Sequence, residues 1–461
     1  MRKYFLVTAL IAIWLVAVGC EITIPDVVVS TIVSEGQAVA TEVAKALTET
    51  AVAGGAPAVT LPSGGGPEAT IAPEPSVTHT IMPTAALPHL RVAFVHNGSP
   101  WLVEPQAAPY PLSQLTGVDS VDISDDGQMV AYIRHDSFDQ PGELRVVNYN
   151  ATGDRSLLTS AQVGALEPLP AGASNVDLYQ VKWIPGSHNL LVSTQVHYMG
   201  PGLGRSDDLF LVNAETGALS VIFAAGTGGE VWPSPDGTKM AISRSSYVSL
   251  CNIDGSGMHA SVFTFTDIIT YSEYSYYPPV VWSPDSTHFG VIIASSDPLA
   301  PATTGSIWTV DAATGAATLQ STLNGTFFLP VGVLSPTLAK VGYIVKTAVP
   351  NVEDSYVSNL DGSSALHLAT GNTAVESFSP DGQYFVYHIG GPTTKYAGSL
   401  GGGTVLIPGS VMRLQWFNNT RFVYAMGTIV GGWTLQIGDT AGGSALIADP
   451  NGNNTNFDAD E

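Results

Sequence analysis

The sequence predicts an all-β fold, a β-propeller of eight four-stranded blades closed by strands from both ends of the chain. Two observations support this prediction. A motif of an apolar or aromatic residue, a four-residue turn and an alternating apolar strand recurs from residue 89 to the C-terminus. Further short strands with tight turns separate these motifs, and repeats of about 40–50 residues with four strands each are typical of propellers.

The recurring turn is clearest in "WPSPDGTKMAIS" (232–243), "WSPDSTHFGVII" (282–293) and "SFSPDGQYFVY" (377–387). Proline sets φ for the second position of a type I turn, Asp and Ser accept hydrogen bonds from the nearby backbone, and Gly closes the turn. Ser379 and Asp381 lie two residues apart in such a turn. Because the same arrangement recurs around the ring, we interpret this pair as turn structure and not as part of an active site.

Aligning the strands that follow the turns gives one equivalent position per repeat. Seven repeats fill it with Ala131, Leu191, Ala241, Gly290, Gly342, Val386 and Val423. An eighth strand, just after residue 89, places Ala93 in the same position. This last repeat lacks a first strand of its own, because the proline-rich segment immediately precedes it.

The C-terminal tail, "NGNNTNFDADE", supplies the missing strand. Laid over residues 371–382, it puts Phe457 on Phe378 and Asp460 on Asp381. Sharing one blade between the two termini removes free sheet edges. We therefore expect eight blades. Seven blades, with the first hairpin packed against the ring, is the alternative.

These turns and strands resemble the TolB-type (WD-like) propeller repeat, in which a tryptophan, S-P-D-G and an apolar strand follow one another. Trp282-Ser283-Pro284-Asp285 and Ser234-Pro235-Asp236-Gly237 match this pattern closely, and Ile184-Pro185-Gly186 and Ser335-Pro336-Thr337 match it in part. The resemblance covers residues 89–461 and implies the fold. It does not imply one function, because the family includes binding proteins, scaffolds and non-catalytic domains of peptidases.

The first twenty residues have the pattern of a secretory signal, with Arg2 and Lys3 before an apolar run that is too short for a membrane span. Small residues precede Cys20, and this arrangement resembles the lipobox of bacterial lipoproteins. The resemblance implies a signal peptide over residues 1–19 and lipid on Cys20, which anchors the protein extracytoplasmically to the bacterial cell membrane or envelope. Several acyl chains anchor stably, whereas one is marginal. An ordinary secretory signal with a chance cysteine is the alternative.

Residues 20–88 are rich in Ala, Pro, Gly and Thr and contain few aromatic residues. Such a segment buries too little apolar surface to offset the entropy of ordering it. We therefore expect a flexible tether between the lipid anchor and the propeller at 89–461. Within the tether, apolar residues at helical spacing indicate a short helix over residues 30–50, either frayed or oligomerising.

The formal net charge is −23, from 39 acidic and 16 basic side chains. An acidic surface repels the phosphates of nucleic acids, so no nucleic-acid partner is expected. It also repels anionic lipid headgroups, so attachment to the membrane should depend on the acyl chains on Cys20.

The sequence shows no pattern for catalytic residues, a metal or a cofactor. It contains no G-x-S-x-G, no H-E-x-x-H and no D-x-D-x-D-G stretch. The turn carboxylates recur once per blade, too far apart to share one metal ion. Cys251 lies in an apolar strand and should be buried. We expect a protein that is not an enzyme; the alternative is a hydrolase or lyase, such as a carbohydrate-active enzyme, with its site in the central funnel.

Loop lengths indicate a binding surface. In a four-stranded blade, the first-to-second and third-to-fourth turns lie on one face of the disc, and here they are short. The second-to-third loops and the links between blades lie on the other face, and several are long: 160–177, 195–208, 266–279, 295–306 and 346–355. Long loops gathered on one face commonly carry function.

The candidate binding residues on this long-loop face are Tyr271, Tyr274, Tyr276, Tyr277, His197 and Tyr198. Tyrosine suits contact with protein or sugar, because it combines a flat apolar area with a hydroxyl group. The alternative is that some of the tyrosines pack beneath their own loop. We expect a membrane-anchored module that binds a protein or glycan partner through this face. A structural envelope component that assembles through residues 30–50 is a further alternative.

Overall fold

The structure is a computed structural model. The residues that it describes are 90–137, 139–198, 203–272, 274–328, 332–428, 432–450 and 454–460. The predicted signal peptide, Cys20, the tether and the helix at 30–50 lie outside the described residues. Within the described ranges, no helix has the length and apolar character needed to cross a membrane.

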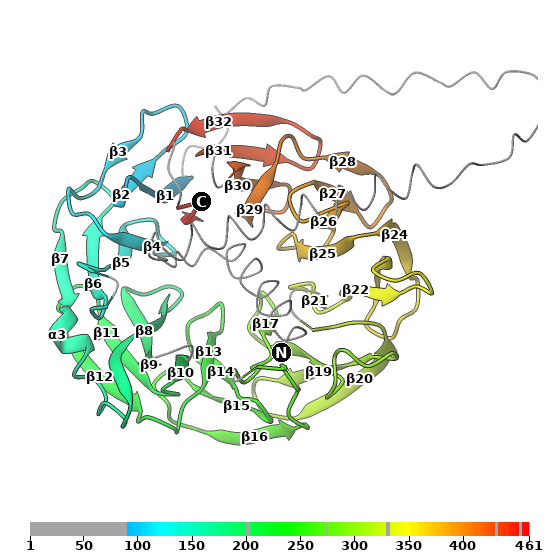
Figure 1. Cartoon of the computed structure of the whole chain (residues 1–461), viewed down its shortest axis with the longest axis horizontal. Helices are drawn as coiled ribbons and strands as arrows, with labels where there is room; N and C mark the ends of the chain where they lie inside the picture. The colour runs from blue at the N-terminus through cyan, green and yellow to red at the C-terminus, as the bar shows by residue number, and fades with distance from the viewer. Residues whose placement is uncertain are drawn as a thin grey trace, which may run out of the picture. The chain divides into compact units, whose positions relative to one another are not determined.

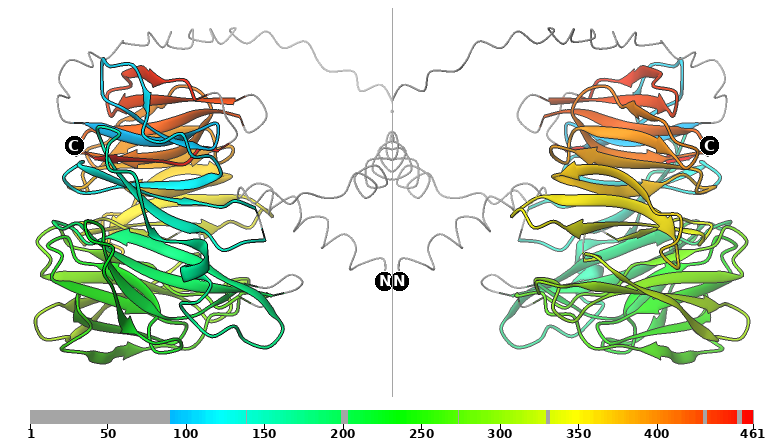
Figure 2. Two further views of the ribbon diagram at one scale, coloured as in Figure 1. Left: turned by 90° about the vertical axis from the view of Figure 1, so that its left-hand side faces the viewer. Right: turned by 90° about the vertical axis from the view of Figure 1, so that its right-hand side faces the viewer.

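Eight antiparallel sheets stand around a central axis, which confirms the predicted eight-bladed propeller (Figure 1). The first strand of each blade lies innermost and the fourth lies at the rim. Seen from the side, the strands run across the thickness of the disc (Figure 2). All successive turns and loops therefore emerge alternately on its two faces, as the sequence pattern requires.

The inner half of each blade consists of its first two strands. The first strands are β33 (Phe457–Asp460), β4 (Val118–Ile123), β8 (Ala173–Trp183), β13 (Glu230–Pro233), β17 (Val280–Trp282), β21 (Val333–Leu334), β25 (Thr373–Phe378) and β29 (Val411–Trp416). The second strands, in the same blade order, are β1 (Arg91–His96), β5 (Met129–Arg134), β9 (Asn189–Tyr198), β14 (Lys239–Ser243), β18 (His288–Ala294), β22 (Lys340–Lys346), β26 (Tyr384–Ile389) and β30 (Arg421–Thr428).

The outer half consists of the third and fourth strands. The third strands are β2 (Ser99–Val103), β6 (Glu143–Asn148), β11 (Leu209–Asn213), β15 (Tyr247–Asn252), β19 (Thr304–Asp311), β23 (Glu353–Asn359), β27 (Lys395–Ser399) and β31 (Gly432–Asp439). The fourth strands are β3 (Tyr110–Pro111), β7 (Arg155–Leu158), β12 (Leu219–Phe223), β16 (His259–Thr264), β20 (Ala317–Asn324), β24 (Leu366–Gly371), β28 (Thr404–Leu406) and β32 (Ser444–Ala448).

One blade carries an addition on the long-loop face. Strand β9 is long and extends beyond the blade, where it pairs with β8 and with a short fifth strand, β10 (Leu203–Arg205). The segment 195–208, predicted as a loop, is therefore largely a hairpin, because the apolar alternation of β9 continues past the blade. The link 160–177 likewise holds a single-turn helix, α3 (Ser160–Val163), capped by Thr159, before β8 begins.

The eight equivalent positions of the sequence alignment coincide in the structure. Each is the third residue of the second strand of its blade, and each is buried. Two of them, Gly290 and Gly342, leave room for the next blade. A Cβ atom at Gly342 would lie 2.6 Å from Val375, and one at Gly290 would lie 2.8 Å from Leu334. The alignment therefore identified the positions at which neighbouring blades pack together.

The C-terminal strand completes the first blade, as predicted. Strand β33 pairs with β1, with Phe457 opposite Phe94, and the Phe457 side chain is fully buried. The predicted register of the tail is wrong by two residues. Ala93 lies opposite Asp458, whereas its equivalent Val386 lies opposite Ser377, so Ala459 and not Phe457 takes the place of Phe378.

The same shift changes the role of Asp460. It lies opposite Arg91 at the end of the strand, in the place of Ser379, and is not a turn aspartate. The overlay matched Phe457 to Phe378 by residue type, whereas the sheet pairs residues 458–460 as it pairs residues 377–379. Likeness of residue type therefore gave the wrong register; in addition, the bulge between Val375 and Ser377 makes Phe457 the counterpart of Val375.

The Ser-Asp pairs are turn structure, as predicted. Ser Oγ donates to Asp Oδ1 at 2.6–2.7 Å in four turns, at Ser124–Asp126, Ser234–Asp236, Ser283–Asp285 and Ser379–Asp381. In each turn the Asp also accepts a backbone N–H two residues further on. These bonds lower the pKa of Asp285 to about 2. Each pair is thus fully engaged in holding its hairpin.

Cys251 is buried in β15, which confirms its predicted structural role. Burial in apolar surroundings raises the pKa of its thiol to about 12. The thiol is therefore protonated at neutral pH and is a poor nucleophile.

Candidate protein-binding face

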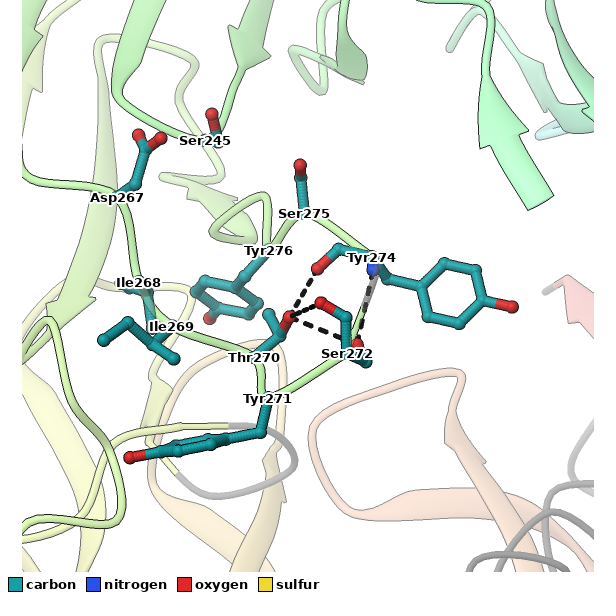
Figure 3. A pocket seen from close by; sticks show the side chains of 10 residues that line it. All are labelled: Ser245, Asp267, Ile268, Ile269, Thr270, Tyr271, Ser272, Tyr274, Ser275 and Tyr276. Atoms are coloured by element: carbon teal, nitrogen blue, oxygen red, sulfur yellow. Dashed lines mark hydrogen bonds between the residues drawn. The ribbon is translucent and has the colours of Figure 1, made fainter. Parts of the chain in front are cut away.

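The tyrosine loop, residues 266–279, links the blades that end in β16 and begin with β17. Its four tyrosines separate into two kinds. Tyr271 and Tyr274 are 61% and 44% exposed, whereas Tyr276 is only 6% exposed. Figure 3 shows the rings of Tyr271 and Tyr274 extending from the loop in different directions, while the ring of Tyr276 turns back toward Ile268. The loop therefore displays two rings and uses others to hold itself.

Tyr276 is the apolar anchor of the loop. Its ring packs against that of Phe328 with the centroids 5.0 Å apart. Burial raises the pKa of its hydroxyl far above the ordinary value. As a candidate binding residue Tyr276 has no accessible ring to offer, because it packs beneath its own loop.

Tyr277 is the polar anchor. It is half-buried, and its hydroxyl donates a 2.9 Å hydrogen bond to Asp207 Oδ2. The guanidinium of Arg205 lies 4.3 Å from the centre of its ring and also lies over Tyr179. Burial, followed by the nearby Asp207 charge, raises the pKa of Tyr277 to about 12. The loop is thus joined to Arg205 and Asp207 of the blade that contains β9 and β10, which comes one blade before the blade that ends in β16.

The displayed part of the loop has a defined shape. Thr270 Oγ1 donates to the carbonyl oxygen of Tyr274 at 2.5 Å, and Tyr271 takes a left-handed backbone conformation with φ of 57°. Beside it lies an open cavity of about 540 Å³ whose lining includes Asp267, Thr270, Tyr271 and Tyr274 (Figure 3). Hydroxyl groups, one carboxylate and aromatic rings thus surround a shallow depression.

Two neighbouring loops extend this surface. The backbone N–H of Ile269 donates to Ser296 O at 2.8 Å, and Tyr271 Oη donates to Asp297 Oδ1 at 2.8 Å. Lys346, the last residue of β22, donates from Nζ to Ala300 O at 3.2 Å. Hydrogen bonds therefore join the loops 266–279 and 295–303, and the end of β22, just before the loop 347–352, is bonded to the second of them; we name these three loops the tyrosine-loop patch.

Exposed apolar side chains gather on the long-loop face. Among the described residues, the large exposed apolar side chains in its loops and hairpin are Leu169, Tyr198, Ile269, Tyr271, Tyr274, Leu299 and Val349. Five of these seven, all except Leu169 and Tyr198, belong to the tyrosine-loop patch. In the described turns of the opposite face, Met258 is the only large exposed apolar side chain. The other large exposed apolar side chains of the described residues lie on the fourth strands of the blades. The two faces therefore differ in chemistry as well as in loop length.

His197 and Tyr198 lie on β9, away from the tyrosine-loop patch. His197 is half-buried, with Nε2 3.7 Å from Asp177 Oδ2, and Asp177 is also 3.1 Å from His135 Nε2. Hydrogen bonds to Asp119 and Asp177 raise the pKa of His135 to about 9. The structure therefore places His197 in a polar cluster of its own, and only Tyr198 is exposed.

The arginines of the long-loop face are engaged by acidic partners. Arg134 pairs with Glu143 at 2.9 Å, Arg205 with Glu230 at 2.8 Å, and Arg244 with Asp207 at 2.6 Å. Sequence reasoning missed these residues, because their partners come from other strands.

The centre of the propeller has a second set of equivalent residues, which we name the central ring. They lie opposite the eight aligned positions, on the innermost strands, and all are partly exposed: Asp458, Asp122, Lys182, Trp232, Val281, Val333, Ser377 and Gln415. One side of the ring is polar and the other apolar. Sequence reasoning did not single out these residues, although the aligned positions lead to them once the sheet register is known.

The central ring bears on the alternative of an enzyme in the funnel. Asp122 and Asp458 are its two acidic members, and the Asp458 carboxylate accepts a hydrogen bond from the backbone N–H of Ile123, the neighbour of Asp122. Glycosidases act with two carboxylates that stand roughly 5–9.5 Å apart. Within the described residues, no group of three or more His, Cys, Asp or Glu side chains is arranged to hold a metal ion.

Comparisons with known proteins give likeness of fold only. No protein-family model and no curated protein matches the chain. A solved eukaryotic initiation factor is 11% identical, with a TM-score of 0.46, over 80% of this chain and 97% of that one. An oligogalacturonate lyase in complex with manganese is 14% identical, with a TM-score of 0.41, over 65% of this chain and 82% of that one.

TolB from Acinetobacter baumannii is also similar in part. It is 13% identical, with a TM-score of 0.32, over 59% of this chain and 68% of that one. At identities and TM-scores this low, the activity or partner of a similar protein cannot be assigned to this chain. The function must therefore be argued from the surface of the chain itself.

Proposed function

We propose that the chain is an extracytoplasmic lipoprotein, anchored through Cys20, whose propeller binds a partner through the long-loop face. The propeller is the binding module, and residues 20–88 set its distance from the membrane. The partner is a protein or a glycan. No catalytic step is part of this proposal.

One observation carries the proposal: the exposed apolar side chains of the loops lie on one face. Single exposed apolar residues are ordinary, but contiguous ones mark interaction sites. Tyr271, Ile269 and Leu299 come from two loops joined by hydrogen bonds, and Val349 lies in the loop that follows Lys346, which is bonded to Ala300 of the second loop. Exposed tyrosines with fixed backbones also lose little side-chain entropy on binding.

The charge of the face limits the chemistry of the partner. The whole chain carries −23, and the arginines of this face are paired with carboxylates. A strongly anionic partner would be repelled. The partner surface is therefore neutral or cationic, with apolar groups that meet Tyr271 and Tyr274.

The binding claim is tested by capture experiments with the soluble propeller. Tyr271→Ser combined with Tyr274→Ser should reduce capture of the partner about tenfold or more, since exposed aromatic residues dominate binding energy at such sites. Glu215→Ser combined with Thr216→Ser, in a turn of the opposite face, should leave capture unchanged. Full capture by the tyrosine variant would show that the binding face has been misplaced.

The anchoring claim has its own test. Cys20→Ser should leave an unprocessed precursor that takes up no radiolabelled fatty acid, whereas Cys251→Ser should be processed and labelled normally. Equal labelling of the Cys20 variant and the parent would exclude the lipoprotein assignment.

A further inference from the structure

The joint between the second and third blades is bridged by a histidine at each face of the disc. Counting from the blade that holds β33 and β1, the second blade contains β4 to β7 and the third contains β8 to β12. At the long-loop face, Nε2 of His135 in the second blade lies 3.1 Å from Oδ2 of Asp177 in the third. At the opposite face, Nε2 of His188 in the third blade lies 2.9 Å from Oδ2 of Asp126 in the second.

The other nitrogen of each ring also faces a carboxylate. His135 Nδ1 is hydrogen-bonded to Asp119 Oδ2 on β4, and His188 Nδ1 lies 2.9 Å from Glu215 Oε1 in the turn between β11 and β12. An ionised carboxylate can only accept a hydrogen bond, so both nitrogens of a ring in this position must carry a proton. The geometry therefore fits the charged imidazolium form of both histidines.

The surroundings of His135 favour its proton. The charged groups that face it are Asp119 on β4, Asp177 on β8 and, beyond Asp177, His197 on β9, whose Nε2 lies 3.7 Å from Asp177 Oδ2. The neighbouring Arg134 is paired with Glu143 on β6 at 2.9 Å, so its charge is balanced. Hydrogen bonds to Asp119 and Asp177 raise the pKa of His135 to about 9.

The surroundings of His188 act in the same direction. Hydrogen bonds to Glu215 and Asp126 raise its pKa above the ordinary value. Beside this contact, Asp125 Oδ2 accepts a 2.9 Å hydrogen bond from the backbone N–H of Gly186, which is a further bond across the same joint. The side chains of His135 and His188 are 23% and 26% exposed, so both rings can exchange protons with solvent.

We propose that the joint between the second and third blades is held by protonated histidines: at neutral pH His135 and His188 are charged and bridge the two blades, and loss of their protons loosens the joint. A neutral ring keeps one N–H and can bond only one of its two carboxylates. A group whose folded pKa is raised contributes fully below its unfolded value, about 6.5, and its contribution is lost as the pH rises through the folded value, about 9 for His135. The joint is therefore closed at neutral pH and loosens in mild alkali.

A tryptophan at this joint provides a direct probe. Trp183 Nε1, at the end of β8, donates a 3.1 Å hydrogen bond to the carbonyl oxygen of Asp122 on β4. Trp282 Nε1, at the end of β17, donates in the same way to the carbonyl oxygen of Trp232 at 2.9 Å, across the joint between the fourth and fifth blades. Intrinsic exchange and global unfolding affect both indoles alike, so the ratio of their exchange rates isolates the local opening of one joint.

The test is hydrogen exchange of the indole N–H groups of the full-length protein, followed by NMR between pH 6 and 9.5. The exchange rate of Trp183 relative to Trp282 should rise about tenfold or more, since each unit of pKa difference corresponds to a factor of ten. In the double variant His135→Gln with His188→Gln, which keeps amide donors that do not titrate, the rise should be about threefold or less. The matched control His367→Gln, at a histidine whose carboxylate partner lies in its own blade, should behave as the parent.

The double variant also separates the histidines from Lys182 on β8. Burial lowers the pKa of Lys182 to about 8, so it titrates in the same range, but it is retained in the variant. If the double variant does not fold, His188→Gln alone, in an exposed turn, should reduce the rise.

A second measurement examines the proton itself. The ring ¹⁵N chemical shifts of His135 at pH 7.5 should be those of an imidazolium. A ratio of exchange rates that does not vary with pH in the parent, or that rises equally in the histidine variants, would overturn the proposal, as would a neutral His135 ring at pH 7.5.

Discussion

The backbone N–H of Ile123 donates a 2.8 Å hydrogen bond to Asp458, although the two residues lie 335 positions apart in the sequence. This bond joins the closing strand to the blade that follows it. The ring therefore depends on a few contacts between the two ends of the described chain. The stability of the whole propeller should respond to changes in this short tail.

Phe457→Ala should lower the free energy of unfolding by about 3–5 kcal/mol, because a fully buried phenylalanine is removed from the core of the closing blade. Leu446→Ala is the control, since Leu446 is exposed on the outer strand β32 and its loss should change stability by about 0.5 kcal/mol or less. Urea denaturation of both variants measures the difference. Similar midpoints would show that the tail does not close the ring.

Gly342→Ala should destabilise the protein by about 1–3 kcal/mol, since the added methyl group would meet Val375 of the next blade at 2.6 Å. Gly401→Ala adds the same methyl group where no atom lies within 4 Å, so its stability should stay close to that of the parent. Thermal unfolding compares the two. If Gly342→Ala melts with the parent, the aligned positions are not the contacts between blades.

The two kinds of tyrosine should respond differently to the same substitution. Tyr276→Ser should lower the free energy of unfolding by about 3 kcal/mol or more, since it removes a buried ring that packs against Phe328. Tyr271→Ser should change it by about 0.5 kcal/mol or less, since that ring is largely exposed. The reverse order, seen in chemical denaturation, would contradict the division into anchors and displayed rings.

The His135 cluster should make stability depend on pH. Its pKa is raised to about 9 by Asp119 and Asp177, so its contribution is complete below the unfolded value of about 6.5 and is lost as the pH rises through about 9. His135 retains some exposure, so we expect a contribution of about 1–2 kcal/mol. The melting temperature of the parent should fall more between pH 6.5 and 9 than that of His135→Gln. Parallel curves would show that His135 does not titrate in this range.

The blades can be predicted from the sequence because their signals are local. Turn residues such as Ser379 and Asp381 bond one another within a single hairpin, and strand alternation has a fixed period. Equivalent residues such as Gly342 and Val386 can therefore be aligned from the repeat pattern alone. The count of eight blades follows from the same pattern.

The details that the sequence does not predict depend on distant contacts. The tail has no S-P-D-G turn to fix its register, so an overlay by residue type shifts residues 458–460 by two positions from their pairing in the sheet. The burial of Tyr276 depends on Phe328 in another part of the chain. The hydrogen bond from the backbone N–H of Ile123 to Asp458 forms only when the ring is closed. None of these contacts has a period that sequence reasoning could use.

The claim that one face of the propeller meets a partner is tested most directly by site-specific photo-crosslinking in the cells that produce the protein. A photoreactive amino acid replaces Tyr271, Leu299, Met258 or Leu446 in turn, all of them exposed positions. The account predicts that Tyr271 and Leu299, on the tyrosine-loop patch, give crosslinks to the same partner, while Met258 and Leu446 give none. Crosslinks to that partner from Met258, with none from Tyr271 or Leu299, would contradict it.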